Sequence, residues 1–213
     1  MMEAFTVLEG IAAPLLRPNI NTDIIIRIER LRDFEGAKLA PYCFESWRYR
    51  RDGSEDPAFV LNKPPYRDAR IMIGGENFAC GSSREAAVWA LKAFGIRCVI
   101  APSFGSIFFS NCFQNGVLPV VVPAGVVEEL ASEVEQMQGQ GRVTVDLNRC
   151  VVVSPSGKET PFTIDALLRQ GMLEGLDQLE LTRAREPQIA AFQARDRASR
   201  PWLYPPPREG VAS

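Results

Sequence analysis

The middle of the chain alternates short apolar runs with segments whose apolar residues recur at helical spacing. The apolar runs at 69–75, 96–103 and 117–123 are bounded by turn-forming residues, which predicts three buried strands. The segments between them, 83–95 and 104–116, each end in a glycine, which is typical of the residue that follows a helix. Strand, helix, strand, helix, strand at this spacing predicts an α/β fold with a parallel βαβαβ core.

The N-terminal third has a less regular pattern. Residues 6–16 form an apolar stretch that predicts a strand region broken at Pro14. Residues 17–26 place a turn-rich segment ahead of a β-branched run, and the proline-containing residues 33–68 predict helix fragments and loops. We therefore expect this third to add a strand and short helices to the core.

The C-terminal part continues with regular elements and ends in a tail. An amphipathic helix is predicted over 124–137, a hairpin over 142–155 and a further helix over 162–173. The last thirty or so residues, roughly counted, begin with a polar helical stretch and finish in the proline-rich sequence PWLYPPPREGVAS. The predicted organisation is one domain over residues 1–183 and a tail over 184–213.

Size, composition and charge narrow the class of protein. The chain has 213 residues, 46% of them hydrophobic, and a net charge of −2, so it can bury one substantial core. The near balance of charge predicts no nucleic-acid partner, because such proteins carry a basic excess or stripe. The start MMEAFTVLEG lacks the regions of a signal peptide, and no apolar run approaches the length that spans a bilayer. We therefore expect a cytoplasmic protein without membrane contact.

The histidine and cysteine content excludes several kinds of site. The sequence contains no histidine, which rules out a Ser-His-Asp or Cys-His nucleophile and any histidine metal ligand within this chain. The cysteines are scattered without a CxxC pair, at Cys43, Cys80, Cys98, Cys112 and Cys150. This pattern predicts reduced thiols and no metal or iron-sulfur cluster bound by this chain alone.

The stretch GGENFACGSSREA, residues 74–86, is the strongest candidate for chemistry. Ser82 followed by Glu85 ahead of an apolar helix matches a capping box, which by itself needs no function. The glycines before it allow close backbone approach, a helix N-terminus offers free N–H groups, and Arg84 adds a planar cation suited to a carboxylate. These features favour a carboxylate site at the edge of a parallel sheet.

Three segments resemble the swivelling domain of the aconitase superfamily. They are GENFACGSSRE (75–85), NINTDIII (19–26) and VIAPSFGSIFFSNCFQNGVLPV (99–120). The matches run in the family's order across most of residues 6–182, and together they are far more specific than any one alone. The resemblance implies a swivelling β/β/α domain of the aconitase C-terminal type, with strands added to the parallel core.

Among such domains, a free-standing chain of this length is similar to the small-subunit family of 3-isopropylmalate dehydratases. This resemblance implies a large-subunit partner that carries a 4Fe-4S cluster on three cysteines. It implies that the two chains together interconvert 2- and 3-isopropylmalate, a small carboxylic acid, by dehydration and rehydration in leucine biosynthesis. The chain would then be half of a hydro-lyase and would bind no cofactor itself.

The resemblance also implies roles for particular residues. Ser82 matches the serine whose alkoxide removes the substrate proton, and Arg84 matches the arginine that binds a substrate carboxylate, with Ser83 beside it. Thr22 and Asp23 match the pair that lies at the site near the cluster. A serine alkoxide needs positive charge and donated hydrogen bonds, and a helix N-terminus next to an arginine supplies both.

The loop after this pair, residues 27–34, is expected to face the variable group of the substrate, so Arg27 and Leu31 join the predicted binding residues. An isopropyl group favours an apolar wall, whereas Arg27, Arg30 and Arg32 are suited to an additional carboxylate unless they point to solvent. Arg27 itself stands where the family frequently has proline.

Two further departures lie beside the site: Ala79 stands where glycine is usual and Ala86 where histidine is common. Two alternative functions stay open. One is a related hydro-lyase for a citraconate or methylmalate, homoaconitate or aconitate type of acid. The other is a non-catalytic module that binds carboxylates. A serine hydrolase is discounted because the chain lacks histidine and a Gly-x-Ser-x-Gly turn.

Overall fold

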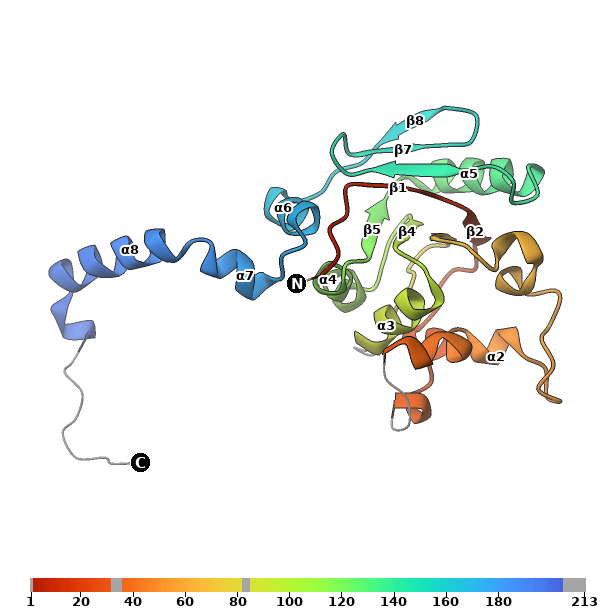
Figure 1. Cartoon of the computed structure of the whole chain (residues 1–213), viewed down its shortest axis with the longest axis horizontal. Helices are drawn as coiled ribbons and strands as arrows, with labels where there is room; N and C mark the ends of the chain where they lie inside the picture. The colour runs from red at the N-terminus through yellow and green to blue at the C-terminus, as the bar shows by residue number, and fades with distance from the viewer. Residues whose placement is uncertain (1, 32–35, 82–84, 205–213) are drawn as a thin grey trace. The chain divides into compact units, whose positions relative to one another are not determined.

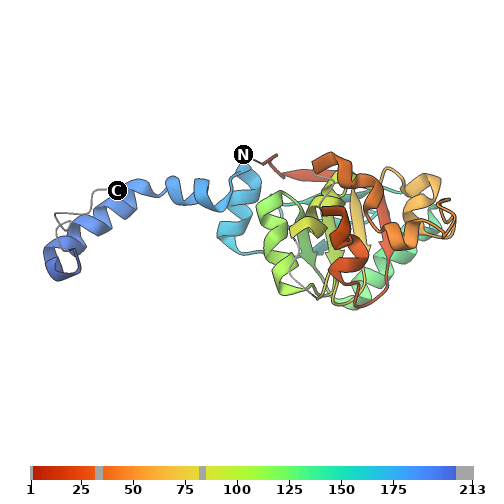
Figure 2. The same cartoon turned by 90° about the horizontal axis from the view of Figure 1, so that it is seen from below.

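The computed structural model describes residues 2–31, 36–81 and 85–204 (Figures 1 and 2). The chain separates into two compact units, Met1–Leu176 and Asp177–Ser213, and each is described by itself. Buried side chains from both sheets of the first unit belong to one continuous hydrophobic cluster.

A four-stranded parallel sheet forms the centre of the first unit, in the order β2-β3-β4-β5. Its strands are β2 (Ala12–Leu15), β3 (Ile71–Gly74), β4 (Cys98–Ala101) and β5 (Leu118–Val121). Helices α3 (Glu85–Phe94) and α4 (Ser106–Asn115) connect the last three strands. The predicted α/β class and its parallel βαβαβ core are therefore confirmed. The strands are buried almost throughout, as expected for a parallel sheet covered on both faces.

A second sheet of four strands is antiparallel throughout, in the order β1-β6-β7-β8. Its strands are β1 (Val7–Gly10), β6 (Val143–Asp146), β7 (Val151–Val153) and β8 (Glu159–Pro161). The predicted hairpin is the β6–β7 pair. Strand β8 was not predicted, because its three residues are polar or proline and carry no apolar alternation.

The apolar stretch 6–16 forms two strands that belong to different sheets, and the chain changes sheet at Ile11, not at Pro14. The Ile11 carbonyl accepts hydrogen bonds from the backbone N–H groups of Arg70 and Ile71 at 3.0 and 3.2 Å. Pro14 lies inside β2, which is an edge strand, where a missing N–H costs little. The predicted break at Pro14 was therefore wrong.

Short helices fill the segment between β2 and β3, as predicted for residues 33–68. They are α1 (Thr22–Ile25), η1 (Ile28–Leu31), η2 (Gly36–Tyr42), α2 (Glu45–Arg48), η3 (Val60–Asn62) and η4 (Pro64–Tyr66). The β-branched run at 24–26 forms no strand, because Asn21 caps a helical turn there. Helix α3 packs against η2, α4 and α1, so its apolar faces are covered from several sides.

Two longer helices complete the first unit. Helix α5 (Ala124–Gln136) packs across β2, β3 and β4. Helix α6 (Ala166–Glu174) begins later than predicted, because the Asp165 side chain accepts hydrogen bonds from the backbone N–H groups of Leu167 and Leu168 and so sets its start.

The second unit contains α7 (Gln178–Arg183), α8 (Glu186–Ser199) and η5 (Pro201–Leu203). At the end of α8, the Tyr204 hydroxyl and the Arg200 guanidinium donate hydrogen bonds to the Asp196 carboxylate and hold its pKa below the usual value. The unit begins at Asp177, and the predicted division at residue 184 stays a prediction.

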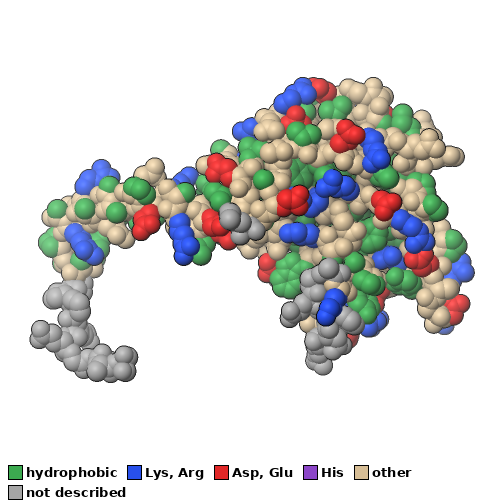
Figure 3. All heavy atoms as spheres, in the orientation of Figure 1, with side chains coloured by type: hydrophobic (Ala, Val, Ile, Leu, Met, Phe, Trp, Pro, Cys, Tyr) green, Lys and Arg blue, Asp and Glu red, His purple; other side chains and the backbone are tan. Residues whose placement is uncertain are grey.

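The visible face of the molecule intersperses basic, acidic and apolar side chains (Figure 3). Among the described helices, none combines the length and the apolar character that a bilayer crossing requires.

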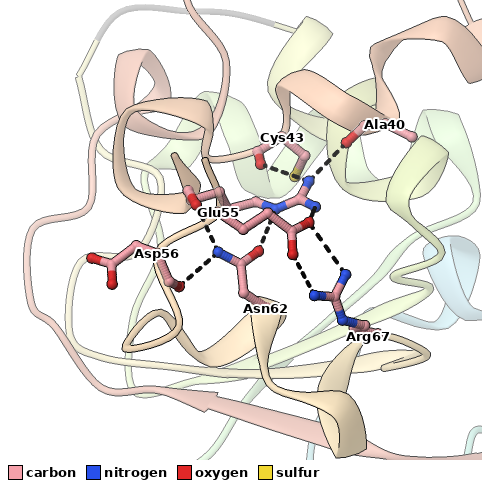
Figure 4. A network of polar contacts seen from close by, with 7 residues as sticks. Ala40, Cys43, Glu55, Asp56, Asn62 and Arg67 are labelled. Atoms are coloured by element: carbon pink, nitrogen blue, oxygen red, sulfur yellow. Dashed lines mark hydrogen bonds and ion pairs between the residues drawn. The ribbon is translucent and has the colours of Figure 1, made fainter. Parts of the chain in front are cut away.

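A buried arginine ties the short helices together (Figure 4). Arg48, only 7% exposed, donates from Nε to Asn62 Oδ1 at 3.2 Å and from Nη1 to the carbonyls of Ala40 and Cys43. The Asn62 amide in turn donates to the carbonyls of Arg48 and Asp56 at 2.6 and 2.8 Å. Removing Asn62 would leave the buried Arg48 Nε without its acceptor, while the carbonyls of Arg48 and Asp56 would keep the backbone N–H donors of Asp56 and Phe59.

Asn62→Ala is expected to lower the free energy of unfolding by about 1–3 kcal/mol, because the buried Arg48 Nε loses its acceptor and two carbonyls each lose one of two donors. Asn148→Ala is the control, since Asn148 is exposed in the β6–β7 turn, and we expect a change within about 0.5 kcal/mol. Urea unfolding followed by circular dichroism measures both. Equal effects of the two substitutions would contradict a stabilising role of the Arg48 network.

Candidate functional site

The loops that follow β2, β3 and β4 meet at the carboxyl edge of the parallel sheet. Two isolated parallel bridges join them beyond the ends of the strands: Asn21 pairs with Cys80, and Phe78 pairs with Phe104. The edge beyond the carboxyl ends of parallel strands is where open α/β folds bind ligands. The candidate site therefore lies on a platform made by three loops.

Cys80 connects the first two loops through its backbone. Its N–H donates to the Ile20 carbonyl at 3.0 Å, and its own carbonyl accepts from the Thr22 N–H at 3.0 Å. Thr22 consequently lies beside Gly81, the last described residue before Ser82. These bonds bring together two of the three segments that carried the resemblance, residues 19–26 and 75–85.

Phe78 connects the second and third loops in the same manner. Its N–H donates to the Ser103 carbonyl at 3.0 Å, and its carbonyl accepts from the Gly105 N–H at 2.9 Å. The Asn77 N–H donates to the Ser103 hydroxyl at 2.8 Å. The Phe78 ring lies against Phe104, with 6.2 Å between centroids, so apolar packing supports the backbone bonds.

Backbone contacts here leave no room for a side chain at residue 105. A Cβ on Gly105 would lie 2.4 Å from the Ala79 carbonyl oxygen and 3.1 Å from the Cys80 Cα. Ala79 has a φ of 55°, in the left-handed region that favours glycine. This conformation gives a physical reason why a glycine suits position 79, and an alanine there costs about 1 kcal/mol of strain.

The predicted residues Thr22 and Asp23 begin helix α1. The Asn21 side chain caps this helix by accepting from the Ile24 N–H at 2.9 Å. Thr22 is buried and Asp23 is exposed. The cap thus orients the pair so that one side chain faces the core and the other faces outward.

The arginines of the next loop gather around one carboxylate. Glu45 Oε2 accepts from Arg30 Nε at 2.9 Å, and Glu45 Oε1 lies 3.6 Å from Arg27 Nε. The Arg30 guanidinium also lies 4.5 Å from the centre of the Tyr42 ring. Half-buried Leu31 packs against the core. Arg27 and Arg30 are therefore paired while remaining partly exposed.

These arginines line a surface hollow of about 540 Å³. Its lining includes two tyrosines, Glu45 and four arginines: Arg27, Arg30, Arg50 and Arg51. The hollow consequently carries more positive than negative groups.

The cysteines differ in burial. Burial raises the pKa of the Cys43 thiol to about 12 and raises the pKa of Cys98 and Cys112 as well, which keeps these thiols protonated at neutral pH. Cys80 and Cys150 are half-buried. Within the part of the chain that the structure describes, no three His, Cys, Asp or Glu residues are grouped so as to hold a metal ion.

The predicted site residues fall into two groups. Ser82, Ser83 and Arg84 lie outside the described residues, as does Arg32. Thr22 and Asp23 lie beside Cys80, which comes shortly before residues 82–84 in the chain. Arg27 and Leu31 follow Asp23 in the loop after β2.

Sequence reasoning missed Glu45 as the partner of the loop arginines. It lies fifteen residues from Arg30, in a region without regular periodicity. It also missed Ser103 and Gly105 as supports of the platform, although both lie in the segment 99–120 that carried the resemblance.

Comparisons with known proteins agree with this architecture. The model of the family "Aconitase C-terminal domain" matches residues 2–125, and the model LeuD_N matches residues 128–166. The 3-isopropylmalate dehydratase small subunit of Cupriavidus necator is 50% identical over 205 residues, covering 95% of this chain and 99% of that protein. The chain belongs to the family of 3-isopropylmalate dehydratase small subunits.

Other members of this small-subunit family are equally similar. The small subunit of Gluconacetobacter diazotrophicus is 51% identical over 201 residues, covering 94% of this chain and 97% of that protein. A crystal structure of the 3-isopropylmalate dehydratase LeuD from Methanocaldococcus jannaschii superposes with a TM-score of 0.62 at 25% identity. The superposition covers 87% of this chain and 98% of the Methanocaldococcus jannaschii chain. The predicted swivelling-domain fold is therefore confirmed.

Gly105→Ala is expected to destabilise the protein by about 2–4 kcal/mol, because the new methyl group would force the 79–81 backbone away from its partners. Gly125→Ala is the matched control, because a Cβ there meets nothing within 4 Å and the residue lies in α5. We expect that change to be neutral or stabilising by up to about 1 kcal/mol. Thermal unfolding of both variants tests this, and an unaffected Gly105→Ala protein would contradict the close packing.

Proposed function

We propose that this chain is the small subunit of a 3-isopropylmalate dehydratase. With its large subunit it interconverts 2- and 3-isopropylmalate by dehydration and rehydration, a hydro-lyase step in leucine biosynthesis. The observation that carries the proposal is the 50% identity to a protein of that name across 95% of this chain and 99% of the relative. Similarity over nearly the full length of both chains supports a shared role of the whole chain.

The proposal divides the reaction between two chains. A 4Fe-4S cluster, held by three cysteines of the large subunit, supplies a Lewis acid for the hydroxyl group of the substrate. This chain has no histidine, and its described cysteines are dispersed, three of them being buried, so its own residues do not fit the cluster. Binding of the substrate carboxylate and transfer of the carbon-bound proton are assigned to this chain.

Ser82 is proposed as the base. An ordinary serine hydroxyl holds its proton too strongly, so the alkoxide requires stabilisation by positive charge and donated hydrogen bonds. Helix α3 begins at Glu85, and its N-terminal N–H groups and dipole therefore lie directly after the catalytic segment in the chain. Arg84 adds a permanent cation. The alkoxide takes the proton from the substrate carbon, and the resulting hydroxyl returns it on rehydration.

The remaining proposed roles concern binding. Arg84 pairs with a substrate carboxylate through its planar guanidinium, and Ser83 contacts the substrate beside it. Thr22 and Asp23 are assigned to the same site, which is supported by the hydrogen bond between the Thr22 N–H and the Cys80 carbonyl.

Arg27 and Leu31 are assigned to the variable group of the substrate. The pairing of Arg27 and Arg30 with Glu45 offsets part of their charge, and this supports an apolar isopropyl group at that position. A second candidate is a hydro-lyase for an acid with a further carboxylate, favoured by the four arginines that line the adjacent hollow.

Two wider expectations accompany the proposal. We place the complex in the cytoplasm, and the proposed partners are the large subunit and a small carboxylic acid, without nucleic acid. The chain alone is expected to be inactive, because the Lewis acid is assigned to the other subunit.

Ser82→Ala tests the role of the base in the co-expressed complex, assayed anaerobically with isopropylmalate. We expect kcat to fall by about 10²–10⁴-fold while KM changes little, since the substituted group acts on the proton. Ser132→Ala, an exposed serine on α5, is the control and should retain full activity. Full activity of Ser82→Ala would contradict the assigned base, whereas an inactive wild-type complex would contradict the proposed function.

A comparison of substrates separates the two candidate functions. The wild-type complex is expected to show its highest kcat/KM with isopropylmalate rather than with citraconate or cis-aconitate. A preference for cis-aconitate would favour the second candidate, because that acid carries the additional carboxylate.

A further inference from the structure

Asn115, the last residue of α4, has a side chain whose oxygen and both N–H donors are engaged in hydrogen bonds. Its Oδ1 accepts from Trp89 Nε1 at 2.9 Å, and its Nδ2 donates to Glu85 Oε1 at 3.0 Å and to the Asn111 carbonyl at 2.9 Å. If the amide were rotated by half a turn, its NH₂ group would face the Trp89 indole N–H and its oxygen would face the Glu85 carboxylate. The partners therefore define one orientation of Asn115.

The contacts of Asn115 reach along α3. Besides Glu85 and Trp89, Lys92 donates from Nζ to the Asn115 carbonyl at 2.8 Å. Residues four and then three positions apart lie on one face of a helix. A single residue of α4 thus holds the exposed face of α3 over two turns.

Asn115 is itself attached to the core. Gly116 follows it with a φ of 72° and caps α4 by donating its N–H to the carbonyl of buried Cys112. The Gly116 carbonyl accepts from Arg97 Nε at 3.0 Å, and Arg97 is only 8% exposed. The contact with α3 is therefore made from a rigid part of the molecule.

The engaged carboxylate belongs to Glu85, the first described residue of α3. Glu85 directly follows Arg84 in the sequence. On the other side of the segment, Cys80 is held by its two backbone hydrogen bonds to Ile20 and Thr22. Before the segment, Gly81 follows the hydrogen-bonded residue Cys80. After the segment, Glu85 is itself held by Asn115.

We infer that Asn115 is a positioning residue for the catalytic segment 82–84: it holds Glu85, the residue that directly follows this segment. This inference rests on the proposed function of that segment. Asn115 does not touch the reacting atoms. It determines the place from which the serine and the arginine are presented, and small displacements of reacting groups reduce rates strongly.

Asn115→Asp is the test, because it keeps the shape of the side chain and replaces the donor to Glu85 with a second carboxylate oxygen. With the large subunit present, kcat/KM is expected to fall between about tenfold and a hundredfold. Glu85→Gln alone keeps an acceptor for Asn115 and should stay within about threefold of wild type. Gln114→Ala, an exposed neighbour on α4, is the control and should be unchanged.

The double variant Asn115→Asp with Glu85→Gln restores a hydrogen bond of reversed polarity, and its kcat/KM should recover to within about threefold of wild type. A general structural role of Asn115 predicts that kcat/KM falls only in step with thermal stability or binding to the large subunit, whereas a positioning role predicts loss of kcat/KM with both retained. Thermal unfolding and binding to the large subunit are measured alongside. If Asn115→Asp does not fold, Asn115→Ser removes the contacts without adding charge and must show the same loss.

The outcomes separate the two claims. Turnover by the wild-type complex together with unchanged kcat/KM in Asn115→Asp or Asn115→Ser would overturn the positioning role and leave the proposed function intact. A double variant no better than Asn115→Asp alone would overturn it as well. A wild-type complex without turnover would overturn the proposed function and, with it, the positioning role.

Discussion

Two backbone hydrogen bonds of Cys80 hold the loop after β2 against the loop after β3, and the candidate site depends on this contact. The N–H of Cys80 donates to Ile20 and its carbonyl accepts from Thr22, which extends the parallel pairing past the ends of the strands. Phe78 forms the equivalent pair with Ser103 and Gly105 in the next loop. Because backbone groups form these bonds, the platform depends on close approach of the chains more than on the identity of side chains.

Much of the core could be predicted from periodicity. Continuous apolar runs separated by helical patterns identified β3, β4 and β5, because strands buried on both faces lose the alternation of polar residues. The split of residues 6–16 between two sheets could not be predicted in this way. Both strands are short and apolar, and only long-range pairing, of β1 with β6 and of β2 with β3, separates them.

The site was predictable in part for a related reason. Local motifs predicted Thr22, Asp23 and the glycine-rich stretch before Ser82 as parts of a candidate site, and the structure brings the first two beside the end of that stretch. Contacts between residues distant in sequence carry no such signal. Glu45 pairs with an arginine fifteen positions away, and Asn115 contacts Glu85 across thirty positions. Both partners are polar residues on short or exposed elements, whose spacing is compatible with many arrangements.

Hydrogen exchange of individual amides in the isolated chain tests the rigid platform most directly. The amides of Cys80 and Thr22 are expected to exchange about as slowly as those of β3 and β4, within roughly tenfold, because they open only when the sheet edge opens. The Gly53 amide, which donates to the Arg50 carbonyl in an exposed turn, is the reference for the exchange rate of a loop amide with only a local hydrogen bond. Exchange of Cys80 and Thr22 at the rate of Gly53 would contradict a platform held in place before the partner and substrate bind.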